Sequence, residues 1–223
     1  MSNLKNYIKK SQSITKLLRF IANNKPEPVP SIKGTGNIFQ NNGLLKNVTI
    51  HIEGNNNRVT IGKHTSINNT VIYMKGNHQQ LTIEDHCFMG NGALWLEDNN
   101  CSLIIKTNTT IEDAHLAVTE NHCQLEIGED CMLAKHIEIR TGDSHSIIDE
   151  TTKERINKAE SVKIGAHVWV GAHVKILKGV TIAANSIIGI AALVTKDVPA
   201  NSIVAGIPAV VVRTNINWHR ARI

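Results

Sequence analysis

The chain has 223 residues, of which 41% are hydrophobic and only 4% aromatic, so it can bury a sizeable core built mainly from aliphatic side chains. Its formal charge of +5 suits an anionic partner, but the basic residues are scattered and no RNA-binding aromatic motif or zinc-finger spacing is present, so nucleic acid is not expected. No signal peptide opens the chain and no apolar run is long enough to span a membrane, which predicts a protein of the reducing cytoplasm.

Residues 1–30 differ from the rest of the chain. Apolar residues separated by Lys and Ser predict one or two short helices up to Ile21, and Pro26, Pro28 and Pro30 would end them. We expect this segment to be a helical cap over the open end of a repeat domain. A basic helix that contacts a membrane surface is the alternative.

Residues 31–148 carry a long repeat with a constant step of twenty-two positions. Four isoleucines are separated by this step: Ile61, Ile83, Ile105 and Ile127. Each has a further apolar residue two positions before it and another six positions after it. Four asparagines are separated by the same step: Asn55, Asn77, Asn99 and Asn121. We interpret each repeat as one coil of three short strands with a turn at the asparagine. Coils stacked at about 4.8 Å would place each asparagine over the previous one, where the side-chain amides can bond in a ladder.

The pattern changes after this region. Residues 149–161 are polar and predict a loop outside the coils. In residues 162–212 apolar positions recur strictly at every sixth position, so that three hexapeptides complete a coil without an inserted turn: Ile164, Val170, Ile176, Ile182, Ile188, Val194. Residues 213–223 form a C-terminal tail. The fold class predicted is mainly β, a parallel β-helix solenoid with a short N-terminal helical segment.

Several motifs in the second half resemble a known family. They are Ile164-Gly-Ala-His-Val-Trp-Val-Gly, Ile176-Leu-Lys-Gly-Val, Val194-Thr-Lys-Asp-Val-Pro, Ala205-Gly-Ile-Pro-Ala and the upstream Arg140-Thr-Gly-Asp-Ser-His-Ser-Ile-Ile-Asp. From about residue 45 to 218 the chain resembles the hexapeptide-repeat acyltransferases, and within them the group that O-acetylates bacterial capsular polysaccharides such as polysialic acid. The resemblance implies a left-handed coil, a homotrimer and acetyl-CoA as acetyl donor. The left hand comes from the resemblance alone, since general sheet rules favour right-handed crossovers.

A histidine is the expected general base, because a sugar hydroxyl is a poor nucleophile at neutral pH and imidazole titrates in that range. Among eleven histidines, His145 lies just before the irregular loop, and only His145 matches the Asp-Ser-His segment that carries the family's base. Asp143 is expected to orient the imidazole. The alternative is a turn histidine beside an Asx turn made by Asp143.

Trp169 is the second candidate, expected in a coil next to His145. The resemblance implies an important tryptophan at this position, and its indole N–H can donate to a thioester or acceptor oxygen. The alternative is a tryptophan that packs at a corner or a trimer contact.

The resemblance also implies a coenzyme A site near the C-terminal coils, in a groove between subunits. The residues at the family's coenzyme positions are Ala172, Ile190, Thr195, Lys196 and Arg213. Lys196 and Arg213 are cations that suit phosphates. No metal is expected, because the sequence shows adjacent His-Cys pairs rather than a ligand cluster. The four cysteines are interpreted as small stacking residues.

The sequence therefore predicts an acetyl-CoA-dependent O-acetyltransferase that acts on a hydroxyl of an anionic bacterial surface glycan, such as a sialic-acid-containing capsule. The alternatives are an acetyltransferase of a small sugar, a sugar-nucleotide amine or an antibiotic, and a non-catalytic solenoid scaffold.

Overall fold

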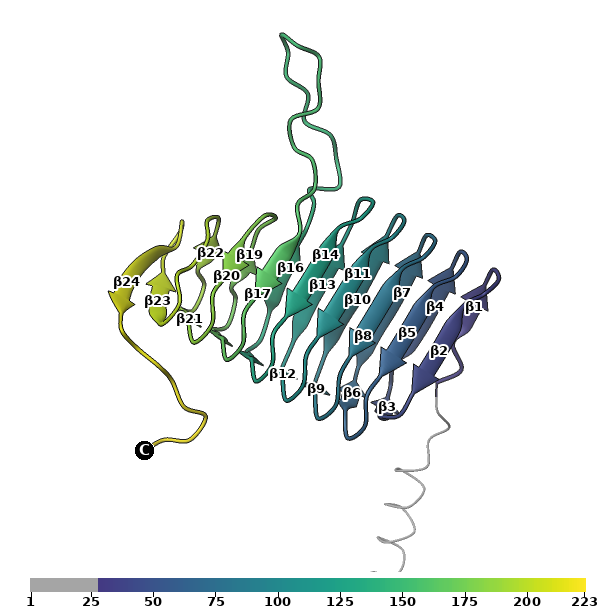
Figure 1. The fold of residues 1–223 in the computed structure, drawn as a ribbon, viewed down its shortest axis with the longest axis horizontal. Helices are drawn as coiled ribbons and strands as arrows, with labels where there is room; N and C mark the ends of the chain where they lie inside the picture. Colours follow the sequence, from purple (N-terminus) through teal and green to yellow (C-terminus); the bar gives the residue numbers. More distant parts are fainter. Residues whose placement is uncertain (1–27) are drawn as a thin grey trace, which may run out of the picture.

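Short strands repeat in a fixed order of three along the chain, and coils of this kind stack along one axis (Figure 1). The computed structural model describes residues 28–223, so the helical cap expected at 1–30 lies almost entirely outside the described residues. The described part contains no helix, and hence none that could cross a membrane.

The strands form three sheets, one along each side of the solenoid. The first sheet contains β1 (Ser31–Lys33), β4 (Thr49–Glu53), β7 (Thr70–Lys75), β10 (Gly92–Glu97), β13 (Ala114–Val118), β16 (Ile137–Arg140), β19 (Lys175–Ile176) and β22 (Leu193–Val194). The second contains β2 (Ile38–Asn41), β5 (Arg58–Ile61), β8 (Gln80–Ile83), β11 (Ser102–Ile105), β14 (Gln124–Ile127), β17 (Val162–Ile164) and β20 (Thr181–Ile182). The third contains β3 (Leu44–Lys46), β6 (Ser66–Asn68), β9 (Phe88–Met89), β12 (Thr110–Ile111), β15 (Met132–Leu133), β18 (Trp169–Val170), β21 (Ile187–Ile188), β23 (Ser202–Ala205) and β24 (Val210–Thr214).

The register of the sheets confirms the two repeat lengths. Ile61 pairs with Ile83 one coil on, whereas Ile164 pairs with Ile182, so the coils after the polar loop are shorter and lack the inserted turn. All neighbouring strands are parallel except β23 and β24, which pair antiparallel at the C-terminal end. The repeated isoleucines and leucines point inward and are almost fully buried, which makes one continuous aliphatic core. Each such side chain contributes about 1.5–3 kcal/mol on burial.

The predicted asparagine ladder is present. The backbone N–H of Asn55 donates to Oδ1 of Asn77 at 2.9 Å, and that of Asn77 donates to Oδ1 of Asn99 at 3.0 Å. The Nδ2 groups of Asn55 and Asn77 reach the same oxygens at 3.1 and 2.9 Å. The ladder therefore satisfies turn amides that no strand pairs.

Most histidines have a structural place in the turns. His64, His78, His86, His122, His136, His167 and His173 all have positive φ angles between 54° and 67°. Asn and Asp occupy equivalent corners in other coils, and these residue types tolerate the left-handed region better than most. His145 does not belong to this set.

The cysteines are buried and unreactive in character. Burial raises the pKa of Cys87 and Cys131 to about 11 and that of Cys101 to about 12. All four thiols are free and lie inside the coils. A nucleophilic role would require the opposite, a lowered pKa and an exposed sulfur.

The segment outside the coils begins earlier than the expected residue 149. β16 ends at Arg140 and β17 begins at Val162, and the intervening chain projects from the corner between the first and second sheets (Figure 1). It folds on itself as a hairpin, in which Asp149 N–H donates to the carbonyl of Glu154 and Ile156 N–H to that of Ile147, both at 2.9 Å. Ile147 and Ile148 look like coil residues in the sequence but lie exposed on this hairpin.

The ladder makes a stability prediction. Asn77→Ala should lower the free energy of unfolding by about 1–2 kcal/mol, because the turn amide of Asn55 loses its acceptor while remaining beside the coil. Urea titration of the purified protein measures this. Thr60→Ala, on an outward face of β5, is the control and should change stability by less than about 0.5 kcal/mol. Equal effects of the two substitutions would contradict a stabilising ladder.

Candidate active site

Five polar residues hold the base of the hairpin, and we call them the loop clamp: Glu120, Asp143, Arg155, Asn157 and Lys178. Lys178 Nζ donates to Asp143 Oδ2, and Arg155 Nη1 donates to Glu120 Oε2 at 2.9 Å. The hydrogen bond from Lys178 is the main cause that lowers the pKa of Asp143, with a further contribution from Asn157, and the hydrogen bond from Arg155 lowers the pKa of Glu120. The clamp therefore keeps both carboxylates ionised at neutral pH.

Asn157 is the centre of the clamp. It is 6% exposed, and its Nδ2 donates to Asp143 Oδ2 at 2.9 Å and to the carbonyl of His145 at 2.8 Å. Its Oδ1 accepts from the N–H of Ile147 at 2.7 Å. One buried amide thus fixes the backbone that directly follows the His145 side chain and also binds the Asp143 carboxylate that precedes it.

The His145 side chain is exposed at the start of the hairpin. Within residues 28–223 its imidazole makes no hydrogen bond, and the carboxylate of Asp143 is directed to Lys178 and Asn157 instead. Asp143 therefore does not contact the ring directly; a hydrogen-bond link through Asn157 connects it to the carbonyl of His145. A free imidazole on a fixed backbone is available to a hydroxyl brought from outside.

Trp169 does not meet His145 within one chain. Trp169 lies in β18 on the third sheet, with its side chain 39% exposed. The hairpin leaves from the corner between the first and second sheets, which is opposite the third sheet in a three-sided coil. The two candidates follow one another along the chain but project from different sides.

The C-terminal tail packs beside Trp169. The Trp218 ring stacks on His167 with centroids 4.1 Å apart and lies 6.1 Å from the ring of Trp169. Asp130 Oδ2 accepts from His167 Nδ1 at 2.7 Å and its Oδ1 accepts from Arg220 at 2.9 Å. Burial by itself raises the pKa of Asp130, but the hydrogen bonds from His167 and Arg220 outweigh it and lower the pKa. This cluster straps the tail across the third sheet.

The five positions expected to bind coenzyme A lie in the C-terminal coils but not in one spot. Ala172 and Ile190 lie one coil apart at the corner between the third and first sheets, where Ala191 N–H donates to the carbonyl of Ala172 at 2.8 Å. Thr195 and Lys196 follow β22, where Lys196 is exposed, and Arg213 is exposed on β24.

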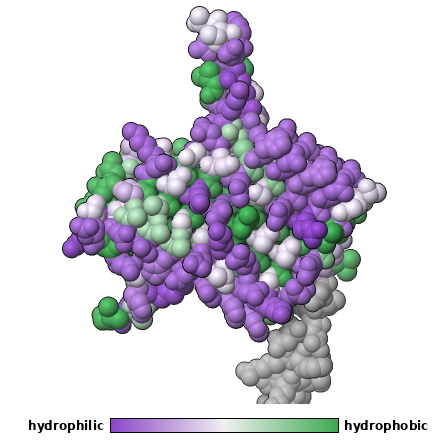
Figure 2. Space-filling model, viewed as in Figure 1, coloured by the Kyte–Doolittle hydropathy of each residue, from purple (hydrophilic) through white to green (hydrophobic). Residues whose placement is uncertain are grey.

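The surface around these positions offers both apolar side chains and cations, the two kinds of group that coenzyme A needs. Ile190 is 71% exposed, and apolar side chains gather at this end of the solenoid (on the left in Figure 2), while Lys196 and Arg213 supply exposed cations. Apolar surface suits pantetheine and cations suit phosphates.

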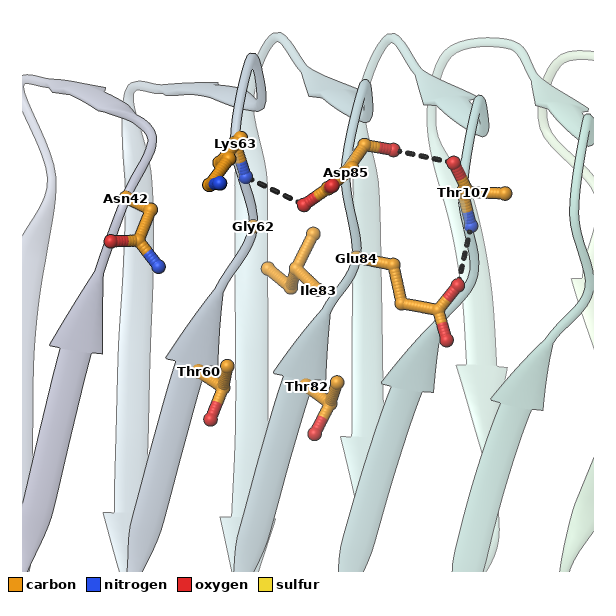
Figure 3. A pocket seen from close by; sticks show the side chains of 9 residues that line it. All are labelled: Asn42, Thr60, Gly62, Lys63, Thr82, Ile83, Glu84, Asp85 and Thr107. Carbon is orange, nitrogen blue, oxygen red and sulfur yellow. Dashed lines mark hydrogen bonds between the residues drawn. The ribbon is translucent and has the colours of Figure 1, made fainter.

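One hollow of the described solenoid is a structural groove. It has a volume of about 400 Å³ and lies at the corner between the second and third sheets (Figure 3). Nine residues from four successive coils line it, the first being Asn42 and the last Thr107. Its carboxylates are already used: Asp85 Oδ1 accepts from the N–H of Lys63 at 2.7 Å, and Glu84 Oε2 from that of Thr107 at 3.0 Å. These groups tie successive coils together, so we assign the groove no chemistry.

Sequence reasoning missed the clamp partners of Asp143. Lys178 lies in the Ile176-Leu-Lys-Gly-Val motif and Asn157 in the polar loop, and nothing in their spacing connects them to Asp143. The sequence indicates Trp218 only as a packing residue of the tail. Within residues 28–223, no three His, Cys, Asp or Glu side chains are grouped as metal ligands would be.

The clamp predicts the protection of the hairpin. Asn157→Ala should increase the rate of tryptic cleavage at Lys153 and Arg155 about tenfold, because a buried amide with several hydrogen bonds is lost and local opening becomes easier. Limited proteolysis followed by mass spectrometry measures the rate. Thr151→Ala at the hairpin tip should leave it unchanged, and equal rates in both variants would exclude a clamp centred on Asn157.

The lowered pKa of Asp143 predicts a pH dependence. Its stabilising contribution is fully present above the unfolded pKa of about 3.9 and is lost as the pH falls through the lower pKa of the folded state. The melting temperatures of the wild type and Asp143→Asn should therefore differ at pH 6, and the difference should shrink as the pH falls below the unfolded pKa. A difference that persists at low pH would show that the charge is not involved.

No family model matches the chain. Among curated proteins, a polysialic acid O-acetyltransferase of Escherichia coli O1:K1 / APEC is 42% identical over 94 residues, which are 42% of this chain but only 31% of that relative. The crystal structure of the polysialic acid O-acetyltransferase OatWY is 34% identical in sequence and matches this structure with a TM-score of 0.83. The match covers 87% of this chain and 93% of the OatWY chain. The structure of the polySia specific acetyltransferase NeuO is 32% identical in sequence, with a TM-score of 0.79. This match covers 88% of this chain and 91% of the NeuO chain. Because these similarities extend over more than four fifths of this chain and of both solved structures, the chain belongs to the hexapeptide-repeat acetyltransferases, in the family of the polysialic acid O-acetyltransferases.

Proposed function

We propose that this protein transfers an acetyl group from acetyl-CoA to a hydroxyl of an anionic bacterial surface glycan, with a sialic-acid-containing capsule polymer as the preferred acceptor. The observation that carries the proposal is the similarity to OatWY over 93% of that chain. The charge of +5 agrees with an anionic acceptor. The proposal includes a left-handed coil and a cytoplasmic location, as in the sequence-based expectation.

His145 acts as the general base. Its ring makes no internal hydrogen bond within the described residues, and its backbone is fixed by Asn157, so it can accept the proton of an approaching hydroxyl. The hydroxyl oxygen attacks the thioester carbonyl, and the proton that His145 received then goes to the departing thiolate of coenzyme A. Asp143 is a positioning residue in this scheme.

Acetyl-CoA, when bound, supplies the thioester carbonyl. Ala172 and Ile190 would contact its pantetheine arm, and Thr195, Lys196 and Arg213 would meet its polar and phosphate groups. Trp169 would donate its indole N–H to an oxygen at the reacting centre.

A homotrimer makes these roles compatible. His145 and Trp169 leave one coil from opposite sides, so a site that uses both must take one of them from a neighbouring subunit. The hairpin supports such a contact, because it carries exposed apolar side chains outside the coils: Ile147, Ile148 and Ile156 are 54%, 48% and 64% exposed. Exposed isoleucines that are grouped on the paired segments of one hairpin suit burial against a second copy.

The proposal predicts thiol release from acetyl-CoA in the presence of polysialic acid. His145→Ala should lower the rate by about 10²–10⁴-fold, the usual contribution of a general base. Free thiol is measured colorimetrically across a panel of polysialic acid, other capsule glycans, simple sugars and amines.

The matched control is His86→Asn. His86 is an exposed corner histidine with φ of 60°, and Asn108 holds the equivalent corner one coil on, so the substitution removes an imidazole without straining the turn. Full activity is expected. Release that survives in His145→Ala would remove the base assignment; release with amines alone would favour N-acetylation; and no release together with no coenzyme A binding would leave a scaffold.

A further inference from the structure

An aromatic ladder runs along the outward face of the first sheet. His51, Tyr73 and Trp95 occupy the same position in three successive coils, paired by the strand register. The His51 and Tyr73 rings are 5.3 Å apart and those of Tyr73 and Trp95 are 4.0 Å apart, with interplanar angles of 12° and 21°. The middle ring is covered on both faces, whereas Trp95, the last ring, has a face that no ladder neighbour covers.

The ladder stops at Ala117. Ala117 is the register partner of Trp95 in the next coil, and Arg140 is the partner of Ala117 in the coil after that. The missing ring leaves a cleft of about 250 Å³, lined by Trp95, Glu97, His115, Ala117, Thr119, Arg140 and Ser144. Ala117 itself is only 3% exposed, so the cleft is the space above its methyl group, between the Trp95 and Arg140 side chains, which stand two strand steps of about 4.8 Å apart.

Arg140 and Ser144 line the cleft and can hydrogen-bond hydroxyls and carboxylates, and Glu138, outside the lining, holds Arg140 in place. Glu138 accepts from Arg140 and lies 3.3 Å from the His115 ring. Burial by itself raises the pKa of Glu138, but the hydrogen bond and charge of Arg140 lower it, so the carboxylate is ionised at neutral pH. Arg140 retains further N–H groups that can pair with a carboxylate ligand.

The charges along this face alternate in sign. Glu53, Lys75 and Glu97 form one register column beside the ladder, with acid and base in turn. An extended polyanion track would require a run of one sign, whereas a sugar ring needs an apolar platform with mixed donors and acceptors around it. The cleft has this second character.

We propose that the gap in the ladder at Ala117 binds one sugar ring of the acceptor glycan, with its apolar face against the indole of Trp95 and its polar groups at Thr119, Arg140 and Ser144. The proposal rests on the proposed function, and it names where the acceptor lies. Ser144 lines the cleft and is the neighbour of His145, so a ring in the gap lies beside the general base of the same subunit.

Ala117→Phe tests the proposal by filling the gap. The column already accommodates rings in the three preceding coils, so the substitution continues the ladder and removes no polar group. We expect the wild-type melting temperature or a higher one, and a KM for the acceptor raised about tenfold or more, as expected when an aromatic contact is lost. Ile104→Phe, which adds the same ring to the outward face of β11, is the matched control.

Glycan binding is measured separately from turnover, by calorimetry with oligosialic acid of defined length on each variant. Transfer by the wild type with an unchanged acceptor KM in Ala117→Phe would overturn the gap as a sugar site. Oligosaccharide binding that is lost in Ala117→Phe but kept in Ile104→Phe, without any acetyl transfer by the wild type, would support the sugar site and overturn the proposed function. If Ala117→Phe melts early, Trp95→Ala is decisive: weakened binding supports the site, and unchanged binding refutes it.

Discussion

The stacking of parallel strands in exact register is the constraint on which the rest of this protein depends. Each strand residue has the residue one coil before and one coil after as its neighbours, so identical positions form columns along the axis. Columns of aliphatic residues make the core, and a column of asparagines closes the turns. A residue whose side chain is smaller or larger than its neighbours in the column therefore leaves a local gap or a local projection, because the neighbouring coils keep their own positions.

The functional candidates lie where this repetition is interrupted. The hairpin replaces a short turn between β16 and β17, and its clamp uses residues from four places in the chain rather than from one column. The tail crosses the third sheet instead of adding a coil, and Arg220 reaches Asn108 and Thr110 far back along the axis. A solenoid is stiff because its columns are regular, so side chains on its interruptions are presented by a rigid support.

The repetitive part of the structure could be predicted from the sequence, and the interrupted part could not. Both periods follow directly from the spacing of isoleucines, and the asparagine ladder follows from the longer period and the strand spacing. The clamp joins Asp143 to Lys178 and Asn157 across a hairpin, and no period relates those positions. For the same reason the sequence predicts a repeat that runs to residue 148, whereas the coil ends at Arg140, and Ile147 and Ile148 lie exposed on a hairpin where Asn157 holds the N–H of Ile147.

A three-sided coil with one hairpin also restricts how a complete site can be built. The hairpin leaves one corner, Trp169 lies on the opposite sheet, and the aromatic ladder runs along the first sheet next to the hairpin. An acceptor that stacks on Trp95 approaches His145 from its own subunit, whereas any group on the third sheet can reach the same point only from another copy. Trp169 and the base would then come from different subunits. Under this arrangement a change at Ala117 alters the acceptor side of the site and leaves Trp169, on another sheet and in another copy, untouched.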